Sequence, residues 1–398
     1  MQRKPLDPMT AAMVKAISRR RVLQAGAFTS VAAFASACGI AAKPRSSASV
    51  APDLSDKEQW VDWSTWIEYI DVDDNGNRPT LDRFLAETGI KVNYNEDYND
   101  NNEFYAKVRP QLEAGQTIGR DLVTATDWMA GLWIEKGYTQ MIDYNNVLNG
   151  VHNLGDAWRG VGFDPNRNHT LPWFSGIGGL GWNKKMLKEL TGKSEIRTVD
   201  ELWDPKLKGR ISILSEMRDS IGVILMSMGK RADEFTDGDF EGAIAILQEQ
   251  IDSGQIRNLS GNDYKAQMAR GEIVAAIAWS GDMLNDTETY GFATPESGGT
   301  LWTDNMLIPV GARHKRNAER WMDFYYDPVN AATVADWVCY ISPVEGAQQA
   351  MEQINPDAVN NQAIFPDDET KKLLQVFMQL NAKQQSSFEQ QFQALAGA

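Results

Sequence analysis

The chain has 398 residues, which is enough for two or three domains at about 100–200 residues per domain. Its composition, 42% hydrophobic and 23% charged, indicates a globular protein, and its formal net charge of −15 argues against a nucleic-acid partner, because phosphate binding needs a basic surface. Three histidines make a histidine-rich metal site a poor hypothesis, and two cysteines exclude a disulfide framework. The thirteen tryptophans are a high count that needs an explanation.

Residues 1–37 have the order of an export signal: a basic stretch, an uncharged apolar run and then small residues. Within them, Ser18–Gln24 resembles the twin-arginine export motif. Ala35–Cys38 resembles a lipobox, in which Cys38 would be acylated after cleavage. We therefore predict a twin-arginine signal peptide at 1–37, and a lipid anchor with a flexible tether at 38–58. The alternative is an ordinary signal peptide that leaves Cys38 unmodified.

From Gln59 onward the sequence predicts alternating strands and helices. In the first part, strands are predicted at 61–66, 90–94 and 121–124, and helices at 79–88, 102–114 and 128–136. Pro79 opens the first of these helices and Gly89 follows its end, as expected for a helix start and a C-cap.

The second part continues the alternation and then becomes mostly helical. Strands are predicted at 176–182, 210–214, 255–258, 273–279 and 306–310, and helices at 184–190, 218–228, 240–252, 263–270, 317–326, 331–339, 345–353 and 382–398. Such alternation predicts an α/β fold with a parallel or mixed sheet covered by helices, and the length suits two lobes. Ligands of such sheets bind at the carboxyl ends of the strands. Trp66, Trp128, Trp279 and Trp302 are predicted at or just past strand ends, so they are candidate ligand contacts.

Three short motifs have plainer explanations than the chemistry they suggest. Gly176–Gly181 satisfies G-x-G-x-x-G, but its glycines lie inside a predicted strand, which favours close approach to a ligand or another segment over a dinucleotide site. Asp71–Asp82 matches part of a calcium loop but ends in Asp rather than Glu, so an acidic surface loop is favoured and calcium binding stays open. Tyr325–Tyr326, a pair typical of ferric-iron sites, lies in an apolar helix, where packing is favoured.

No motif for a catalytic nucleophile, a zinc protease or a phosphate-binding loop is present, which lowers the odds of an enzyme. What recurs instead is an aromatic residue close to an acid, in the segments Trp66–Tyr69, Thr126–Trp128, Trp279–Asp282 and Trp302–Asp304. Aromatic faces attract ammonium groups, and carboxylates form charge-assisted hydrogen bonds with them. The pattern therefore predicts a site for an extended organic cation, and the alternative is core packing beside solvated acids.

These segments, in this order, resemble the polyamine-binding (spermidine/putrescine) proteins of bacterial ABC importers from about Trp63 to Pro366. The resemblance is carried by the segments Thr65–Ile70, Phe84–Val92, Arg120–Val123, Leu202–Gly209, Gly271–Gly281, Leu301–Pro309, Cys339–Pro343 and Phe365–Thr370. It implies a periplasmic-binding-protein-like fold, in which two α/β lobes, each a mixed sheet flanked by helices, are joined by hinge strands and close over a ligand. The implied divisions are 59–169 for the first part of lobe 1, 170–304 for lobe 2, and 305–398 for a return to lobe 1 with C-terminal helices.

The resemblance also implies a set of ligand-binding residues. The aromatic contacts would be Trp66, Tyr69, Trp128, Trp279, Trp302 and Tyr340, and the polar contacts Glu68, Thr126, Glu216, Asp219 and Asp304. Asp304 matches the central amine-binding acid, and Asp219 an acid that holds a terminal amine. Glu216 is the less firm second acid, because Ser215–Asp219 is one residue shorter than the family pattern, and Trp128 stands where Tyr is more common.

The resemblance thus implies a binding protein that catalyses nothing, needs no cofactor or metal, and delivers a polyamine to an ABC permease. We expect a monomer in the periplasm or on the outer face of the cytoplasmic membrane, anchored through Cys38. The alternatives are a binding protein for another organic cation, a sugar or ferric iron, and a secreted enzyme. Which polyamine is bound is not decided by the sequence.

Overall fold

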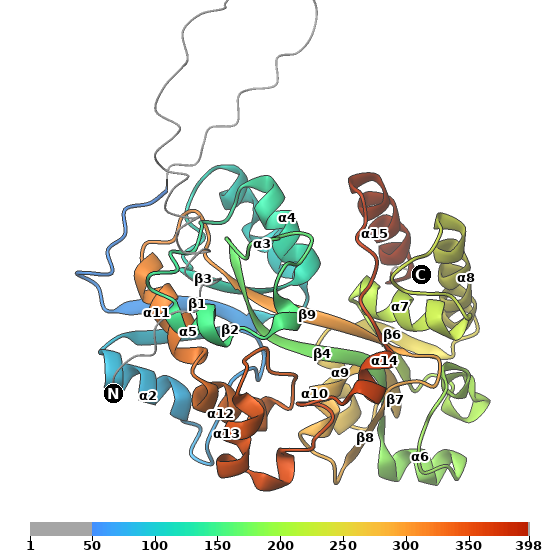
Figure 1. Cartoon of the computed structure of the whole chain (residues 1–398). Coiled ribbons are helices and arrows are strands. Elements are labelled where there is room, and N and C mark those ends of the chain that lie inside the picture. The colour runs from blue at the N-terminus through green and yellow to red at the C-terminus, as the bar shows by residue number, and fades with distance from the viewer. Residues whose placement is uncertain (1–49, 397–398) are drawn as a thin grey trace, which may run out of the picture.

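The computed structural model describes residues 50–396, so the predicted signal peptide, Cys38 and most of the tether lie outside the described residues. Within that range, ten strands form one mixed sheet in the order β2-β1-β3-β9-β4-β7-β5-β6, with β10 on β9 and β8 on β4 (Figure 1). The strands are β1 (Trp60–Trp66), β2 (Lys91–Tyr98), β3 (Leu122–Thr126), β4 (Thr170–Asn183), β5 (Ile211–Leu214), β6 (Ile256–Ser260), β7 (Ala275–Trp279), β8 (Tyr290–Ala293), β9 (Gly299–Leu307) and β10 (Leu374–Gln375).

Two long central strands join the halves of the molecule. Strand β9 pairs with β3 on one side and with β4 on the other, both antiparallel, and the far part of β4 pairs with β7 and β8. Figure 1 shows β4 and β9 crossing between β1–β3 and the strands of the other half. We call the half around β1–β3 the first lobe and the half around β5–β7 the second lobe. The predicted α/β architecture with connecting strands is confirmed, whereas the boundaries at 169/170 and 304/305 stay predictions.

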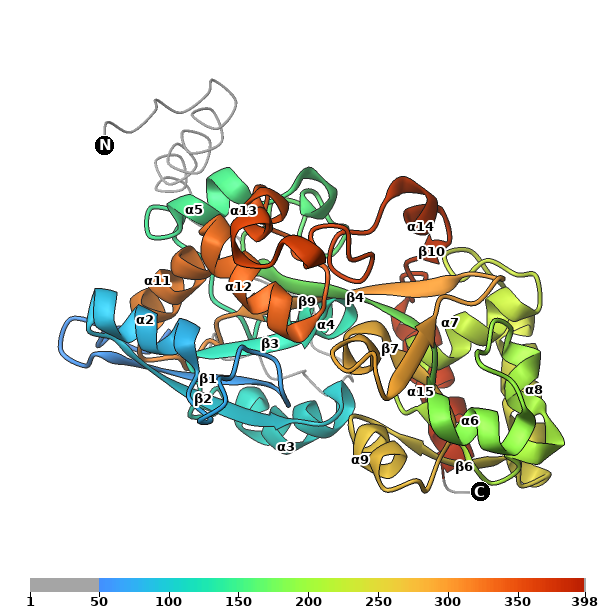
Figure 2. The same cartoon turned by 90° about the horizontal axis from the view of Figure 1, so that it is seen from below.

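Helices cover both lobes (Figure 2). Those of the first lobe are α2 (Pro79–Thr88), α3 (Asn101–Glu113), α4 (Asp127–Lys136), α5 (Leu148–Asn153), α11 (Lys315–Tyr325), α12 (Pro328–Val338) and α13 (Ala347–Ile354). Those of the second lobe are α6 (Lys184–Thr191), α7 (Met217–Ser227), α8 (Asp237–Asp252), α9 (Asp263–Ala269) and α10 (Ser280–Leu284). The chain ends with α14 (Asp368–Lys372) and α15 (Ala382–Ala396). No helix within residues 50–396 combines the length and the apolar character needed to cross a membrane.

The last helix does not follow α11 and α12 back to the first lobe. Helix α15 packs on α8, where the rings of Phe240 and Phe388 stack with centroids 3.8 Å apart. Gln384 also donates a hydrogen bond to Asp237 at the start of α8. Figure 1 shows α15 beside α7 and α8. The C-terminal part of the predicted return to lobe 1 thus lies on the second lobe, because its phenylalanines complete the apolar face of α8.

An aromatic cluster holds the first lobe together. Trp63 of β1 is fully buried, and its ring centroid lies 4.9 Å from that of Trp173 on β4 and 5.4 Å from that of Trp321 on α11. The hydroxyl of Tyr325 donates to the carbonyl oxygen of Trp173, and that of Tyr326 to Pro172. Both tyrosines are fully buried, so the packing interpretation of this pair holds and their hydroxyls are occupied by the backbone.

The glycine-rich segment is part of β4, as predicted, but the strand is twice as long as expected. A Cβ atom added at Gly176 would lie 2.2 Å from Cζ2 of Trp302, and one at Gly178 would lie 2.2 Å from Oγ1 of Thr300. Only glycine lets β4 and β9 carry these larger side chains on the same face. The motif therefore serves close packing of two strands, not the strand–turn–helix geometry of a dinucleotide site.

The predicted acidic loop closes on itself. Both carboxylate oxygens of Asp73 accept hydrogen bonds from Asn75 and Asn77, and Asp71 accepts one from the backbone of Thr80. Among the described residues, the side chains that come close enough to share a metal ion lie elsewhere. The surface-loop interpretation of Asp71–Asp82 is therefore the better supported one.

Candidate functional site

A cavity of about 800 Å³ lies where the two lobes meet. All eleven residues that the sequence suggested as ligand contacts line it, although they come from segments between Trp66 and Tyr340. The first lobe contributes the ends of β1 and β3 and the start of α4, and the second contributes α7 and the end of β7. The structure thus brings the predicted residues together, while their roles as ligand contacts stay predictions.

The aromatic side chains form a continuous series around the cavity. The ring of Trp279 lies 5.9 Å from Trp66 and 6.4 Å from Trp302, centroid to centroid. Tyr340 then lies 5.1 Å from Trp302 and 5.6 Å from Tyr69. Trp66 and Trp279 end their strands as predicted, but the expected position of Trp302 was wrong, because it lies inside β9. Four ring-to-ring contacts leave little freedom to these side chains, so the wall is pre-formed.

Asp304 is a buried acid that lines the cavity. It lies on β9 opposite Thr126 of β3, and its side chain is 3% exposed. The hydroxyl of Thr126 donates to its Oδ1 over 2.7 Å and that of Tyr69 to its Oδ2 over 2.9 Å. Burial raises the pKa of Asp304 to about 7; the two hydrogen bonds lower it, and nearby Asp127 and Asp219 raise it further. A buried carboxylate held by neutral donors is an attractive site for an ammonium group.

Asp219 forms a second acid position on α7. Its Oδ2 accepts a hydrogen bond of 3.0 Å from the indole of Trp279, and its Oδ1 one of 2.7 Å from the hydroxyl of Thr300. Burial raises its pKa, although both hydrogen bonds lower it. Asp219 therefore repeats the arrangement of Asp304: one buried carboxylate, two neutral donors and an adjacent aromatic ring.

Glu216 has a different setting from the other two acids. Its Oε1 accepts hydrogen bonds from the backbone and the side-chain amide of Asn101, which opens α3 on the other lobe. Burial raises its pKa well above the ordinary value, and the nearby charge of Asp100 adds to the effect. Ser215 also reaches across, to Asp100, over 2.8 Å. Glu216 thus lines the cavity and joins the lobes at the same time.

The ring of Trp128 is in contact with a charged side chain of the protein. The guanidinium of Arg218 lies 4.1 Å from the centre of its ring, a cation–π contact between the lobes. Arg218 is held in turn by α15, through an ion pair with Glu389 and a hydrogen bond to Gln385. One face of Trp128 is therefore occupied by a side chain of the protein itself.

Glu68 is likewise engaged by the protein. Lys265 of α9 forms an ion pair with Glu68 from the opposite lobe, and its Nζ lies 3.5 Å from Oδ1 of Asp282. Asp282 also accepts hydrogen bonds from the hydroxyls of Tyr264, over 2.6 Å, and Tyr340, over 3.2 Å. Glu68 and Asp282 both line the cavity. They differ from Asp304 and Asp219 in forming ion pairs with a lysine of the protein.

The family described as bacterial extracellular solute-binding protein matches residues 80–366, which is most of the chain. The chain belongs to this family. The solute-binding protein is 26% identical to the spermidine/putrescine-binding periplasmic protein of Salmonella typhimurium, over 77% of its own length and 82% of that protein's. It is 27% identical to a putrescine/cadaverine-binding protein of Pseudomonas aeruginosa, over 80% and 88% of the two lengths.

The fold is also that of a solved relative. The structure of a spermidine/putrescine ABC transporter substrate-binding protein from Streptococcus pneumoniae superposes with a TM-score of 0.66 at 24% identity, covering 85% of this chain and 98% of that one. The two-lobed fold expected from the sequence is therefore shown.

Several residues in or next to the cavity were not predicted as ligand contacts from the sequence. Lys265 lies on a short helix, where a lysine is expected to be exposed to solvent, so nothing in the local sequence indicates that it lies near the cavity. Phe377, Gln379 and Gln385 also line the cavity, and of these only Gln385 lies in the Gln-rich stretch that was predicted as a helix at 382–398. Asp282 ends one of the aromatic and acidic segments that the sequence analysis identified, Trp279–Asp282, although it was not among the predicted ligand contacts.

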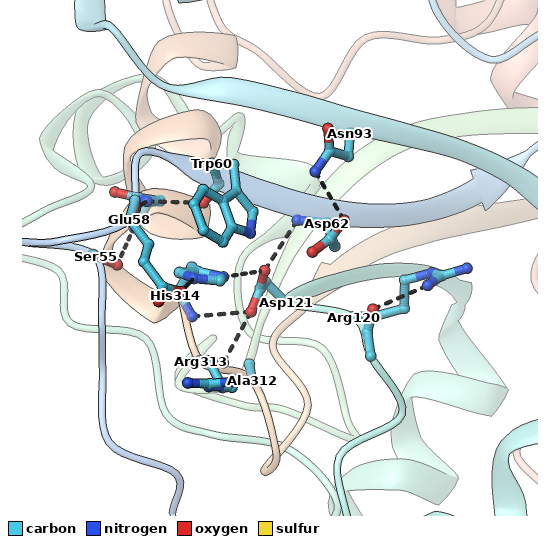
Figure 3. A network of polar contacts seen from close by, with 12 residues as sticks. Ser55, Glu58, Trp60, Asp62, Asn93, Arg120, Asp121, Ala312, Arg313 and His314 are labelled. Carbon is cyan, nitrogen blue, oxygen red and sulfur yellow. Dashed lines mark hydrogen bonds and ion pairs between the residues drawn. The ribbon is translucent and has the colours of Figure 1, made fainter.

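A second polar cluster lies apart from the cavity, between β1 and the start of α11 (Figure 3). Asp62, Asp121 and His314 bring ligand-type atoms within 4.8 Å of one another. However, Oδ1 of Asp121 accepts two backbone N–H groups, and its Oδ2 faces the ring Nδ1 of His314 and the backbone N–H of Asp62. The other ring nitrogen of His314 lies 2.7 Å from Glu58. Because these groups already satisfy one another, the cluster is a clip that ties residues 55–62 to residues 312–317.

Proposed function

We propose that this solute-binding protein captures a linear polyamine of the putrescine and spermidine class between its two lobes and delivers it to an ABC permease. The observation that carries the proposal is the repeated arrangement of Asp304 and Asp219, each a buried carboxylate beside tryptophan or tyrosine rings that accepts its hydrogen bonds from neutral donors. An ammonium group placed at either position gains a charge-assisted hydrogen bond and a cation–π contact. The names of the relatives support the same ligand class.

The aliphatic chain of such a ligand can pack against two tryptophans of the cavity. Trp279 and Trp302 lie side by side along the cavity wall, and a methylene chain stacked on them buries apolar area at about 25 cal/mol per Å². The protein then acts by binding alone, without a catalytic step, and passes its ligand to a membrane partner. Export through residues 1–37 and anchoring through Cys38 belong to the same proposal, since an extracytoplasmic position is where such a protein meets its ligand.

Binding of amines to the purified protein tests the proposal. Isothermal titration with putrescine, cadaverine, spermidine and spermine should give saturable binding for at least one of them. At a hundred times the dissociation constant, the ligand should stabilise the fold by about 2.7 kcal/mol. Asp304→Ala should weaken binding far more than Asp368→Ala, which changes an exposed acid on α14. Equal effects of the two substitutions would refute the site, and no binding of any of the four amines would refute the ligand class.

A second ligand class is favoured by one observation. The indole N–H groups of Trp66 and Trp302 are buried beside the cavity without a hydrogen-bond partner among the described residues. An amine that also carries a hydroxyl or carbonyl oxygen could accept hydrogen bonds from them, whereas a simple polyamine cannot. Amino alcohols and amino acids with a terminal amine should therefore be titrated in the same series, and tighter binding than that of every polyamine would establish this alternative.

A further inference from the structure

The acids of the cavity differ in the groups that face them. Asp304 and Asp219 accept hydrogen bonds from hydroxyl and indole donors and form no ion pair with the protein, although the charge of Arg218 also acts on Asp219. Glu68 and Asp282 share the ammonium group of Lys265 instead. Two further acids, Asp127 and Glu216, accept hydrogen bonds from asparagines. Asp304, Asp219 and the pair Glu68 and Asp282 are thus three acid positions beside the aromatic wall, and at the third one ammonium of the protein already faces the two carboxylates.

The three positions are connected through the aromatic series. Tyr69 donates to Asp304, and its ring stands at 90° to that of Tyr340, whose hydroxyl donates to Asp282. On the other side, Trp279 donates to Asp219, and its ring lies 6.1 Å from that of Tyr264, which also donates to Asp282. An amine chain that extends beyond Asp304 and Asp219 along these rings thus approaches Asp282.

Lys265 keeps its charge in this setting. Burial lowers the pKa of Lys265, but the carboxylates of Asp282 and Glu68 outweigh burial and raise it above the ordinary value for lysine. Its side chain is 22% exposed, and that of Asp282 is 10% exposed, so the pair is only weakly screened by solvent. Although Lys265 does not itself line the cavity, its ammonium lies against two carboxylates that do.

We propose that Lys265 is a specificity-determining residue: it occupies a third ammonium position with an ammonium of the protein, and so selects ligands with two charges over ligands with three or four. The inference rests on the proposed function and adds a preference for diamines over longer polyamines. A third ligand ammonium near Glu68 and Asp282 meets a like charge and finds both carboxylates already paired. A diamine that reaches only Asp304 and Asp219 is little affected.

The test compares affinity ratios, because Lys265 also joins the lobes and its loss would weaken a merely structural contact for every ligand alike. Putrescine and spermidine are titrated against the unaltered protein, Lys265→Gln, Lys265→Met, Lys265→Arg and Lys185→Gln. Lys185 is the matched control, since it lies on α6 of the same lobe, is largely exposed and pairs only loosely with Glu189. Melting curves establish that each variant is folded, and Met offers a second way to remove the charge if Gln destabilises α9.

The unaltered protein should prefer putrescine. Removal of the charge by Gln or Met should raise the spermidine-to-putrescine affinity ratio by roughly tenfold or more, because a like charge within a few ångströms of the third ammonium is gone. Lys265→Arg and Lys185→Gln should leave the ratio unchanged. A ratio that stays within about twofold in both charge-removing variants overturns this inference alone. Failure of every amine to bind any of the folded proteins overturns the proposed function as well.

Discussion

Amine binding should strengthen with pH across the range in which Asp304 ionises. Burial raises the pKa of Asp304 to about 7 when no cation is beside it. A bound ammonium favours the ionised carboxylate and lowers that pKa, so binding releases a proton from Asp304. The ligand itself does not titrate here, because alkyl ammonium groups lose their proton near pH 10. Affinity therefore rises with pH up to about 7 and then levels off.

The expected magnitude follows from the same pKa. At pH 5, which is two units below a pKa of about 7, only about 1% of Asp304 is ionised, so the affinity should be roughly 100-fold weaker than at pH 9. This factor corresponds to about 2.7 kcal/mol. Asp127, whose burial raises its pKa to about 6, lies close by and acts in the same direction below pH 6. It can steepen the dependence but cannot reverse it.

Titration calorimetry of putrescine between pH 5 and pH 9, at constant ionic strength, measures this dependence. Repeating the measurement near pH 6 in buffers of different ionisation enthalpy counts the released protons, and the expected number is close to one. Asp304→Asn should bind weakly and with a nearly flat pH profile above pH 6, whereas Asp368→Asn, on the exposed start of α14, should follow the unaltered protein. An affinity that is constant from pH 5 to pH 8, or that falls with rising pH, would refute the assignment of Asp304 as the ammonium-binding acid.

Three further outcomes are expected. Gly176→Ala should displace Trp302 and weaken amine binding by about tenfold or more in titrations, while Gly238→Ala, whose new Cβ would meet nothing closer than 3.8 Å, should be neutral. Ligand binding should reduce the radius of gyration in X-ray scattering as the lobes close, and identical curves with and without a bound ligand would contradict hinge motion. Burial lowers the pKa of His314, but its hydrogen bonds with Glu58 and Asp121 outweigh burial, so the pKa lies above the ordinary value for histidine. The protonated His314 therefore stabilises the fold fully below pH 6.5, and this stabilisation is lost as the pH rises through the raised pKa. His314→Gln should therefore lower the melting temperature by about 2–4 °C more at pH 6 than at pH 9; an equal loss at both values would show that the charge of His314 is irrelevant.

Local sequence signals predicted most of the elements, because those signals and the final packing agree. Helix α2 begins at Pro79 and ends before Gly89, as predicted from the proline and the C-cap glycine alone. Gly89 has a φ of 73°, which a glycine adopts without strain. The aromatic and acidic residues after β1 and β3 converged as expected, since these parallel strands end at the same edge of the sheet. Strand β7 runs the opposite way, and its end reaches the same cavity from the second lobe.

The central strands were harder to predict, for a physical reason. Strand β9 was expected only at 306–310, yet it begins at Gly299 and contains Trp302, Thr303 and Asp304. Polar residues in a buried strand resemble a loop in a hydrophobicity pattern, but here they face a cavity and pair with one another across β3 and β4. The polar residues of the site are therefore the reason why the first part of β9 was not predicted as a strand.

Interactions between segments that are distant in the sequence could not be predicted either. Asp219 and Lys265 are separated by more than forty positions from each other and from Glu68, and nothing local shows that a carboxylate keeps neutral neighbours while another acquires an ammonium. That difference decides how many ligand charges the cavity can take, since acids count as ligand sites only when the protein leaves them unpaired. The excess of acids in the composition says little about the ligand, because most of those acids are solvated; the placement of Lys265 beside two acids of the cavity is what leads us to infer a preference for ligands with two charges.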